Sequence, residues 1–435
     1  MTERRKFIQK IAGLTAAFSA PSLLQQAWAA NWEQVNQKAQ GLTPQELATD
    51  EDYWSVIQQA YTVNSNMVNL NNGGVSPAPR VVQEAVERFN QLSNEAPSYY
   101  MWRILDQGRE PVRYKLATLA GSSPDEIAIN RNATEALNTV IFGYPFKAGD
   151  EVIGTKQDYP NMIQAYRQRA LRDGIVYTQL SFDFPIEDDN TIVAAFEKAI
   201  TTNTKLIHIT HIINWVGQIM PVKKIAAMAH THGIEVIVDG AHSFGLLDFK
   251  IPDLGCDYFG TSLHKFLSAP IGSGMLWIQK DKIEKIWPLL CNDKPHSTDI
   301  RKFETLGTRS FPIEQGIGEA VNFHMAIGPK RKEERVRYLK NYWATKALTI
   351  SGVKIHTSLK DKYACGICGV TIDGMTPAAL DGALYTGYKI HTVGIVWENI
   401  SCVRITPHIY TRIQDLDKLV TALTEIAAKQ KSGTA

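Results

Sequence analysis

A carboxylate and a lysine follow apolar segments in the middle of the chain, and together they could hold an aromatic cofactor. The run 234–238 (IEVIV) predicts a buried parallel strand, and Asp239 comes directly after it. Lys265 ends the sequence Ser-Leu-His-Lys further along. Open α/β sheets bind ligands beyond the carboxyl ends of their strands. A lysine amine can bond to an aldehyde and a carboxylate can keep a ring nitrogen protonated, which are two needs of pyridoxal phosphate.

A second polar segment follows another predicted strand. Residues 126–130 (EIAIN) are typical of a strand, and Asn-Ala-Thr-Glu (132–135) lies between it and a predicted helix. A strand, a polar turn and a helix start present free amides and the positive end of the helix dipole, which suit a phosphate. An ordinary helix N-cap has the same pattern, and a single Asp or Lys is commonly structural. The chemical interpretation therefore depends on how many such segments agree.

The motifs D-G-A-H (239–242) and S-L-H-K (262–265), with the distance between them, resemble the class V, cysteine-desulfurase-like family of pyridoxal-phosphate enzymes. The resemblance covers nearly the whole chain after its amino terminus. It implies an α/β structure of fold type I, with a mostly parallel seven-stranded sheet flanked by helices and a smaller α+β C-terminal domain. We therefore expect an N-terminal segment 30–75 packed on the small domain, a large cofactor-binding domain 76–318 and a small domain 319–435. A single helix over 320–348 is expected to lead into the small domain.

The resemblance implies a role for each motif. N-A-T-E matches the family's phosphate loop, and the segment after the next strand offers Tyr159 as the ring that stacks on the cofactor. Asn214 and His242 would bond the cofactor's phenolic oxygen. The segment Asn-Trp-Val-Gly (214–217) departs from the family's N-E-T-G, so the resemblance does not identify the substrate. The expected catalytic residues are Lys265, Asp239 and His242. The expected cofactor-binding residues are Ala133, Thr134, Tyr159, Asn214, Asp239, His242, Ser262, His264, Lys265 and Thr308.

Three segments are expected to bind substrate or a second subunit. R-I-T-P-H-I-Y (404–410) resembles the family's carboxylate-binding segment, with Arg404 as a planar two-pronged donor; an internal salt bridge is the alternative. Asn72 and Gly73 are expected to line the substrate pocket, or else to form only a tight turn. F-E-T-L-G-T-R (303–309) resembles the segment that reaches a neighbouring subunit's cofactor phosphate through Thr308. It implies a homodimer with a shared active site, and a loop within one subunit is the alternative.

The residues do not fix which reaction follows removal of the α-proton by the freed Lys265 amine. Transamination, epimerisation and C–S cleavage all remain open. Residues 387–399 contain no cysteine and Cys402 lies two residues from Arg404, which disfavours a desulfurase. The D-G-A-H and F-E-x-x-G-T-R segments most resemble isopenicillin N epimerase-like proteins. We expect aminotransferase-type chemistry on an amino acid through a Lys265 Schiff base, with an epimerase or racemase next and a C–S lyase third. A non-catalytic exported binding protein would have no need of Lys265, Asp239 and Arg404 together.

The amino terminus predicts export. Arg4 and Arg5 precede the apolar run 11–20 and a small-x-small site at 27–29, the order of a twin-arginine signal peptide over residues 1–29. The alternative is a cytosolic amphipathic start. We expect a periplasmic protein that is not attached to the membrane after cleavage, since no other segment is apolar for long enough to span it.

Charge and cysteine usage argue against other partners. The formal net charge is +2, and the run 330–337 mixes both signs, so a nucleic-acid partner is not expected. The five cysteines are an odd number, and Cys365 and Cys368 lie in an apolar run. We expect both to be core thiols, with no disulfide between them and no metal site.

Overall fold

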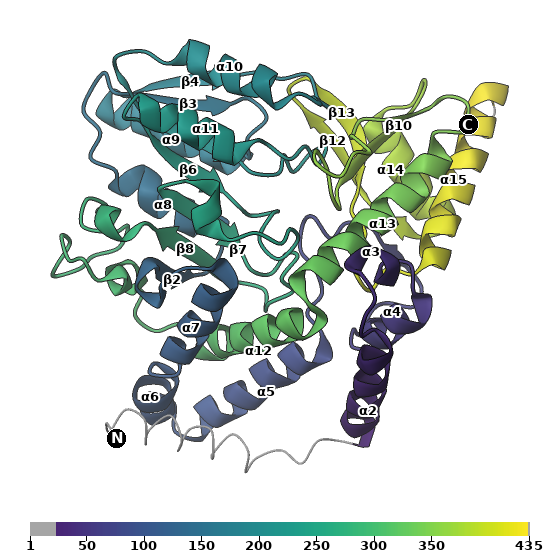
Figure 1. Ribbon diagram of the computed structural model, residues 1–435, viewed down its shortest axis with the longest axis horizontal. Helices are drawn as coiled ribbons and strands as arrows, with labels where there is room; N and C mark the ends of the chain where they lie inside the picture. The colour runs from purple at the N-terminus through teal and green to yellow at the C-terminus, as the bar shows by residue number, and fades with distance from the viewer. Residues whose placement is uncertain (1–22, 434–435) are drawn as a thin grey trace.

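The computed structural model describes residues 23–433, with side chains from Asn31 onward. The predicted signal peptide, 1–29, therefore lies almost entirely outside the described residues. Two sheets lie at opposite sides of the described chain, as Figure 1 shows. The larger one has the order β2-β8-β7-β6-β5-β3-β4. Its strands are β2 (Ile127–Asn130), β3 (Glu151–Thr155), β4 (Val176–Leu180), β5 (Thr204–Thr210), β6 (Glu235–Asp239), β7 (Tyr258–Ser262) and β8 (Gly274–Ile278).

Only β8 runs against the other strands of this seven-stranded sheet, and every other neighbouring pair is parallel. Strands β3, β7 and β8 are buried along their whole length, because helices cover both faces of the sheet. The predicted fold class, with a mostly parallel seven-stranded sheet, is confirmed. One face packs on α8 (Ala133–Gly143) and α9 (Pro160–Asp173). The other packs on α7 (Arg109–Ala120), α10 (Asp189–Ala199), α11 (Val222–Thr231) and α12 (Phe311–Ile327).

The smaller sheet is antiparallel, with the order β12-β13-β10-β9. Its strands are β9 (Val353–Ile355), β10 (Cys368–Ile372), β12 (Val393–Trp397) and β13 (Ile400–Ile405). It packs on α13 (Pro329–Ala347), α14 (Pro377–Tyr388) and α15 (Ile413–Ser432) through Leu339, Leu380 and Leu423. A short parallel pair, β1 (Val68–Asn69) with β11 (Ile390–His391), joins the segment before the large sheet to this part of the chain.

The N-terminal helices lie against α13. They are α2 (Leu23–Lys38), α3 (Pro44–Leu47) and α4 (Glu51–Gln58). The Arg335 Nη1 of α13 donates to the Ala48 carbonyl at 2.9 Å, and its guanidinium pairs with Glu51. Helix α5 (Arg80–Glu95), α6 (Pro97–Tyr99) and the π-helix η1 (Tyr100–Leu105) follow, and α5 packs beside α12 below the large sheet (Figure 1). The limits of the three predicted domains stay predictions.

The single helix predicted over 320–348 is wrong. The structure has two helices, because Gly328 adopts a φ of +98° and Pro329 begins α13 without an amide hydrogen. Helix α12 stays with the large sheet through Ile317 and Val321, so the predicted boundary at 318–319 falls inside it. The break at Gly328 lets α13 turn away toward the small sheet.

The structure places the cysteines and the possible metal-ligating side chains within the described part of the chain. All five cysteines are free thiols there, and Cys365 and Cys368 are buried. Cys365 lies before β10 and Cys368 begins it, so the pair does not share one strand. No group of three or more His, Cys, Asp or Glu residues is placed to hold a metal ion among residues 23–433. No described helix is long and apolar enough to cross a bilayer.

Candidate active site

The carboxyl ends of β5, β6 and β7 bring the central motifs together. The register pairs Thr210 with Asp239 and Asp239 with Gly260, so Asp239 lies level with its neighbours at one edge of the sheet. Lys265 follows the end of β7 in a tight turn, in which the Ser268 amide donates to the Lys265 carbonyl at 2.9 Å. The acid and the lysine predicted to hold the cofactor are therefore on adjacent strand ends.

Lys265 and His242 contact each other directly. The Lys265 Nζ lies 2.9 Å from the His242 Nε2. Burial lowers the pKa of Lys265 to about 8, although the Asp239 carboxylate opposes this change. Burial, followed by the positive charges of Lys265 and Arg404, holds the pKa of His242 well below its ordinary value. His242 is therefore neutral, its Nε2 accepts from the lysine, and its Nδ1 carries the proton.

Asp239 is buried beside this pair. Its Oδ1 accepts a hydrogen bond from the Ala241 amide at 2.9 Å. Burial raises its pKa, while His208 and Lys265 favour the charged form. A buried carboxylate gains most from a cationic partner, so Asp239 is suited to a protonated ring nitrogen.

Arg404 reaches the same region from β13 of the small sheet. Its Nη1 donates to the Asn214 carbonyl at 2.9 Å and its Nη2 to the Asn71 Oδ1 at 3.0 Å. Its Nε is buried without a partner, and burial lowers its pKa to about 10. Arg404 forms no ion pair with any carboxylate of the described chain, so the alternative of an internal salt bridge is not found there. A buried guanidinium without a counter-charge suits an anionic ligand.

The loop predicted to line the substrate pocket lies against Arg404. A Cβ on Gly73 would be 3.1 Å from the Arg404 Cζ, which explains the glycine. The Asn72 side chain is bonded internally, since its Nδ2 donates to the Thr406 carbonyl at 2.8 Å and its Oδ1 accepts from the Tyr410 hydroxyl at 2.6 Å. Its neighbour Asn71, which the sequence analysis did not select, is the side chain that contacts Arg404. Asn72 therefore anchors the loop, and Asn71 lies closer to where a substrate carboxylate would bind.

The predicted phosphate loop begins α8. The Asn132 Oδ1 caps the helix by accepting from the Glu135 amide, and the Ala133 amide donates to the Ser262 Oγ at 2.9 Å. The Ser262 hydroxyl hydrogen therefore remains available to an anion. Thr134 lies in the first helical turn, where the helix dipole favours negative charge. Ala133, Thr134 and Ser262 thus lie together.

No hydrogen bond within the described chain joins three further predicted residues to this cluster. The His264 Nδ1 lies 3.0 Å from the Ser273 carbonyl, to which it donates. Tyr159 precedes α9 with its side chain 40% exposed, and it makes no ring contact with another described aromatic residue. Thr308 is exposed and lines a cavity of about 450 Å³ on the other side of the 130–132 turn.

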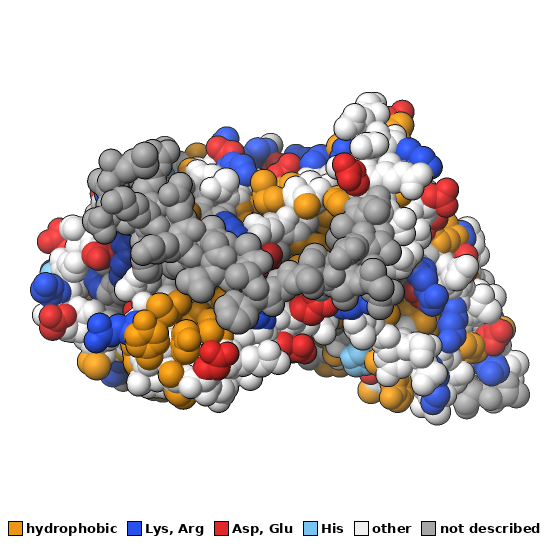
Figure 2. Space-filling view, turned by 90° about the horizontal axis from the view of Figure 1, so that it is seen from below, with side chains coloured by type: hydrophobic (Ala, Val, Ile, Leu, Met, Phe, Trp, Pro, Cys, Tyr) orange, Lys and Arg blue, Asp and Glu red, His pale blue; other side chains and the backbone are white. Residues whose placement is uncertain are grey.

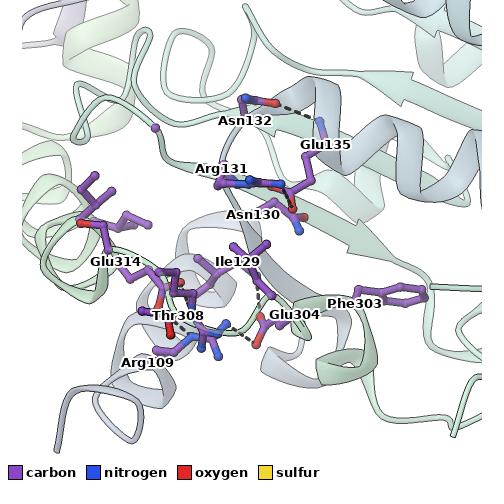
Figure 3. Close-up of a pocket in the computed structure, with 16 residues that line it drawn as sticks. Arg109, Ile129, Asn130, Arg131, Asn132, Glu135, Phe303, Glu304, Thr308 and Glu314 are labelled. Atoms are coloured by element: carbon purple, nitrogen blue, oxygen red, sulfur yellow. Dashed lines mark hydrogen bonds and ion pairs between the residues drawn. The ribbon is translucent and has the colours of Figure 1, made fainter. Parts of the chain in front are cut away.

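Buried ion pairs hold the wall of that cavity (Figure 3). The Glu304 carboxylate binds Arg109 at 2.7 Å and Arg113 at 2.6 Å. The Glu314 carboxylate forms ion pairs with Arg109 and Arg309, each at 2.9 Å. The network fixes the segment 304–314, which carries Thr308, against α7. The opposite wall includes Asn132, the cap of the predicted phosphate helix.

The comparisons with known proteins bear directly on this arrangement. The family model for class V aminotransferases matches residues 68–419. This chain belongs to the class V aminotransferase family. The fold class, the pyridoxal-phosphate cofactor and the enzymatic nature predicted from the sequence are confirmed at the level of the family.

Its relatives include two kinds of enzyme. This chain is 26% identical over 393 residues to isopenicillin N epimerase from Streptomyces clavuligerus. The alignment covers 86% of this chain and 99% of the epimerase. It is 28% identical over 385 residues to a probable cysteine desulfurase from Halalkalibacterium halodurans, which covers 82% and 93% of the two chains. The predicted likeness to isopenicillin N epimerase is thus confirmed, beside a likeness to desulfurases.

Solved structures agree on the fold. Cysteine desulfurase from Thermococcus onnurineus matches with a TM-score of 0.77 and 19% identity, covering 86% of this chain and 98% of that one. The cystine C–S lyase C-DES, in complex with its product cysteine persulfide, matches with a TM-score of 0.76 and 22% identity, covering 83% and 98%. At these identities the likeness establishes the fold alone.

This class V chain differs from the family pattern at Trp215. The Trp215 indole donates to the Gln157 carbonyl at 2.8 Å, and its ring centroid lies 5.9 Å from that of Trp397 on β12. The Trp397 indole donates to the Lys156 carbonyl at 2.8 Å. The two indoles therefore join the small sheet to the loop that carries Tyr159. The sequence showed the departure from N-E-T-G but not its partner, because Trp397 is distant along the chain.

Proposed function

We propose that the protein is a pyridoxal-phosphate enzyme that acts at the α-carbon of an amino acid, with Lys265 as the residue that binds the cofactor. The observation that carries the proposal is the meeting of four ionisable side chains from different parts of the chain. The Lys265 amine is 2.9 Å from His242, beside the buried Asp239 carboxylate, and the unpaired guanidinium of Arg404 approaches from the other sheet. A charged, buried group of this kind is typical of a catalytic site.

The residues fit the cofactor. Asp239 would hold the ring nitrogen protonated, and Ser262, Thr134 and the start of α8 would hold the phosphate. Two buried atoms without partners in the described chain, the Nδ1 of His242 and the Oδ1 of Asn214, are available to the remaining polar groups of the ring. When bound, the cofactor supplies an acceptor for the electrons of the bond broken at the α-carbon.

The chain's own residues would bind the substrate and move its proton. Arg404 binds the α-carboxylate through charge-assisted hydrogen bonds, and Asn71 orients the guanidinium from behind. The Lys265 amine, whose pKa burial lowers to about 8, would be the base that accepts the α-proton of the substrate. Trp215 and Trp397 help to exclude water on the side of Tyr159.

We infer aminotransferase-type chemistry first and epimerisation second. The epimerase alternative is favoured by the alignment over 99% of isopenicillin N epimerase. C–S cleavage is third, because a desulfurase needs a reactive thiolate near the substrate. Cys402 is buried in β13 beside Arg404, and burial raises its pKa to about 12, so its thiol is not available as a nucleophile.

Incubation of the purified holoprotein with single amino acids in deuterated water separates the three reactions. Keto-acid formation indicates transamination, deuterium at the α-carbon with loss of chirality indicates epimerisation, and sulfide or pyruvate release indicates C–S cleavage. A panel of amino acids that produces none of these signals, and no change in the visible spectrum, would instead support a binding protein.

The recombination of the cofactor-free protein with pyridoxal phosphate should depend on pH. Because burial lowers the pKa of Lys265 to about 8, the amine is protonated and unreactive below that pH and free to attack the aldehyde above it. The rate of colour formation should therefore rise with pH and be half-maximal near pH 8. A midpoint near the ordinary lysine pKa of 10.5 would contradict the buried position of this amine.

The Arg404→Gln change should weaken substrate binding. Loss of a charge-assisted pair costs roughly 2–3 kcal/mol, so the KM for an amino acid should rise by about 30- to 150-fold. The control is Arg335→Gln, which removes a buried arginine that Glu51 already neutralises. That variant should lose stability but keep its KM, and an equal rise in KM for both would argue against Arg404 as the carboxylate ligand.

We also propose a homodimer in which Thr308 reaches the partner's cofactor phosphate. The side of the molecule formed by α5 and α12 carries exposed hydrophobic side chains (Figure 2), and Val81, Tyr99, Trp102 and Tyr114 are among the exposed large apolar residues. Thr308 is exposed within one chain and is held on a rigid segment. Light scattering on the holoprotein should give twice the mass of one chain, and a monomer that keeps its cofactor would contradict the proposal.

Twin-arginine export to the periplasm remains a proposal that depends on the sequence of residues 1–29. Fractionation of cells that express the full chain should place it in the periplasm. An Arg4→Lys, Arg5→Lys double variant should stay in the cytoplasm, and periplasmic recovery of that variant would contradict the proposed route.

A further inference from the structure

The turn that carries Lys265 is held by hydrogen bonds to both its main chain and its side chains. The Ser76 amide donates to the His264 carbonyl at 3.1 Å. This bond ties the residue before Lys265 to the segment that follows Asn72 and Gly73, which are predicted to line the substrate pocket. The His408 Nε2 lies 3.2 Å from the Ser268 Oγ, and Ser268 has a φ of +59°, which is unusual for a residue other than glycine. A turn with such a backbone needs contacts from its surroundings to persist.

A buried lysine contacts the same turn from behind. Lys332 lies in the first turns of α13 with 2% of its surface exposed, and its Nζ donates to the Phe266 carbonyl. Phe266 is the residue directly after Lys265, and its ring stacks on His408 with the centroids 6.0 Å apart. The amine of Lys332 therefore fixes the peptide unit next to the residue that would bind the cofactor.

The surroundings of Lys332 contain no counter-charge. It forms no ion pair with a carboxylate of the described residues, and His324 and His408 are the ionisable groups that respond to its charge. Burial, followed by the charge of Lys332, holds the pKa of each histidine well below its ordinary value, so neither can neutralise the amine. A buried amine without an ion pair costs folding free energy, and an apolar residue of similar length would avoid that cost.

We propose that Lys332 is a positioning residue for Lys265, and that it holds the lysine-bearing turn in place by donating to the Phe266 carbonyl. The inference rests on the proposed role of Lys265. Without the Lys332 bond, the Phe266 carbonyl loses its buried hydrogen-bond donor and the turn that carries Lys265 is held less firmly. The Lys265 amine would then have to be ordered at each encounter with the cofactor. The expected consequence is slower covalent capture of pyridoxal phosphate by a protein that remains folded.

The chain provides a matched control on the same helix. Lys340 is also fully buried in α13, and its Nζ donates to a main-chain carbonyl, that of Ser358, at 2.9 Å. Ser358 lies in the loop between β9 and β10, away from the Lys265 turn. Lys332→Met and Lys340→Met thus remove the same kind of bond from the same helix, and only the first bond touches the residue after Lys265.

The test measures how fast each cofactor-free protein regains its visible colour with pyridoxal phosphate, together with its thermal unfolding midpoint. We expect Lys332→Met to recombine about 10-fold more slowly than the wild type, which corresponds to about 1.4 kcal/mol, the usual scale of one buried hydrogen bond. We expect Lys340→Met to match the wild-type rate and Lys332→Arg to restore most of it. Recombination of Lys332→Met at the wild-type rate, or equal slowing by Lys340→Met, would overturn the proposal.

Two further comparisons keep the outcome clear. If Lys332→Met does not fold, Lys332→Gln is compared with Lys340→Gln, because an amide at each position keeps a donor without the charge. Lys265→Ala is measured in parallel and should regain no colour of the wild-type kind. Colour in Lys265→Ala would refute the proposed role of Lys265 itself, whereas its absence together with a normal rate for Lys332→Met would refute only the role of Lys332.

Discussion

The Lys265→Ala variant is expected to lose both the visible absorbance of the holoprotein and its turnover. Lys265 would bind the cofactor covalently and then act as the base, so its removal takes away two functions at once. We expect turnover to fall by roughly 10⁴-fold or more. The Lys265 amine lies 2.9 Å from the His242 imidazole and beside the Asp239 carboxylate. Neither of these two groups can bond to the cofactor's aldehyde in place of the amine.

Lys340→Ala is the control for the loss of a buried lysine, since Lys340 bonds only to the Ser358 carbonyl in the small domain. It should keep the wild-type spectrum and turnover even if its unfolding midpoint falls. An unchanged yellow colour in Lys265→Ala, or an equal loss of turnover in Lys340→Ala, would show that Lys265 is not the cofactor-binding residue.

The Asp239→Asn variant is expected to keep the colour but to lose about 10²- to 10³-fold in turnover, because removal of one preorganised electrostatic group commonly costs that much. The amide has the same shape and can still accept from the Ala241 amide. It cannot hold a ring nitrogen in its protonated form, and the electrons released at the α-carbon would then be poorly accepted.

Asp257 offers a buried carboxylate at the opposite end of the same strands. Its Oδ2 accepts from the Val236 amide at 2.7 Å, at the amino end of β6. Asp257→Asn should lower the unfolding midpoint without lowering turnover per folded molecule. Wild-type turnover in Asp239→Asn, measured at saturating cofactor, would contradict the role given to this carboxylate.

Much of the fold follows from short-range patterns. Largely apolar runs such as 234–238 predicted buried parallel strands, and polar residues directly after them predicted which side chains meet at one edge of the sheet. Asp239 ends β6 and Lys265 follows β7, so the two residues come close together because these strands are neighbours in the sheet. The break between α12 and α13 was missed although Gly328 and Pro329 are visible in the sequence, because residues that favour a helix continue on both sides of them.

Other parts of the site depend on contacts between distant segments, which short-range sequence patterns do not predict. Nothing in Asn-Asn-Gly-Gly distinguishes Asn71, which contacts Arg404, from Asn72, which Thr406 and Tyr410 hold. Lys332 lies in a run of charged residues, KRKEERVR, and such a run is typical of a solvated helix face. The structure buries Lys332 and Arg335 in that run, because the turn after Lys265 and the N-terminal helices pack against α13.

The central claim is that the amine at position 265 binds the cofactor. Reduction of the holoprotein with borohydride, followed by proteolysis and mass spectrometry, would fix any imine bond and show which lysine carries it. The account predicts that the added mass lies on the peptide that contains Lys265 and on no other lysine. Reduced cofactor on a different lysine, such as Lys332, or none on any peptide of a coloured protein, would contradict it.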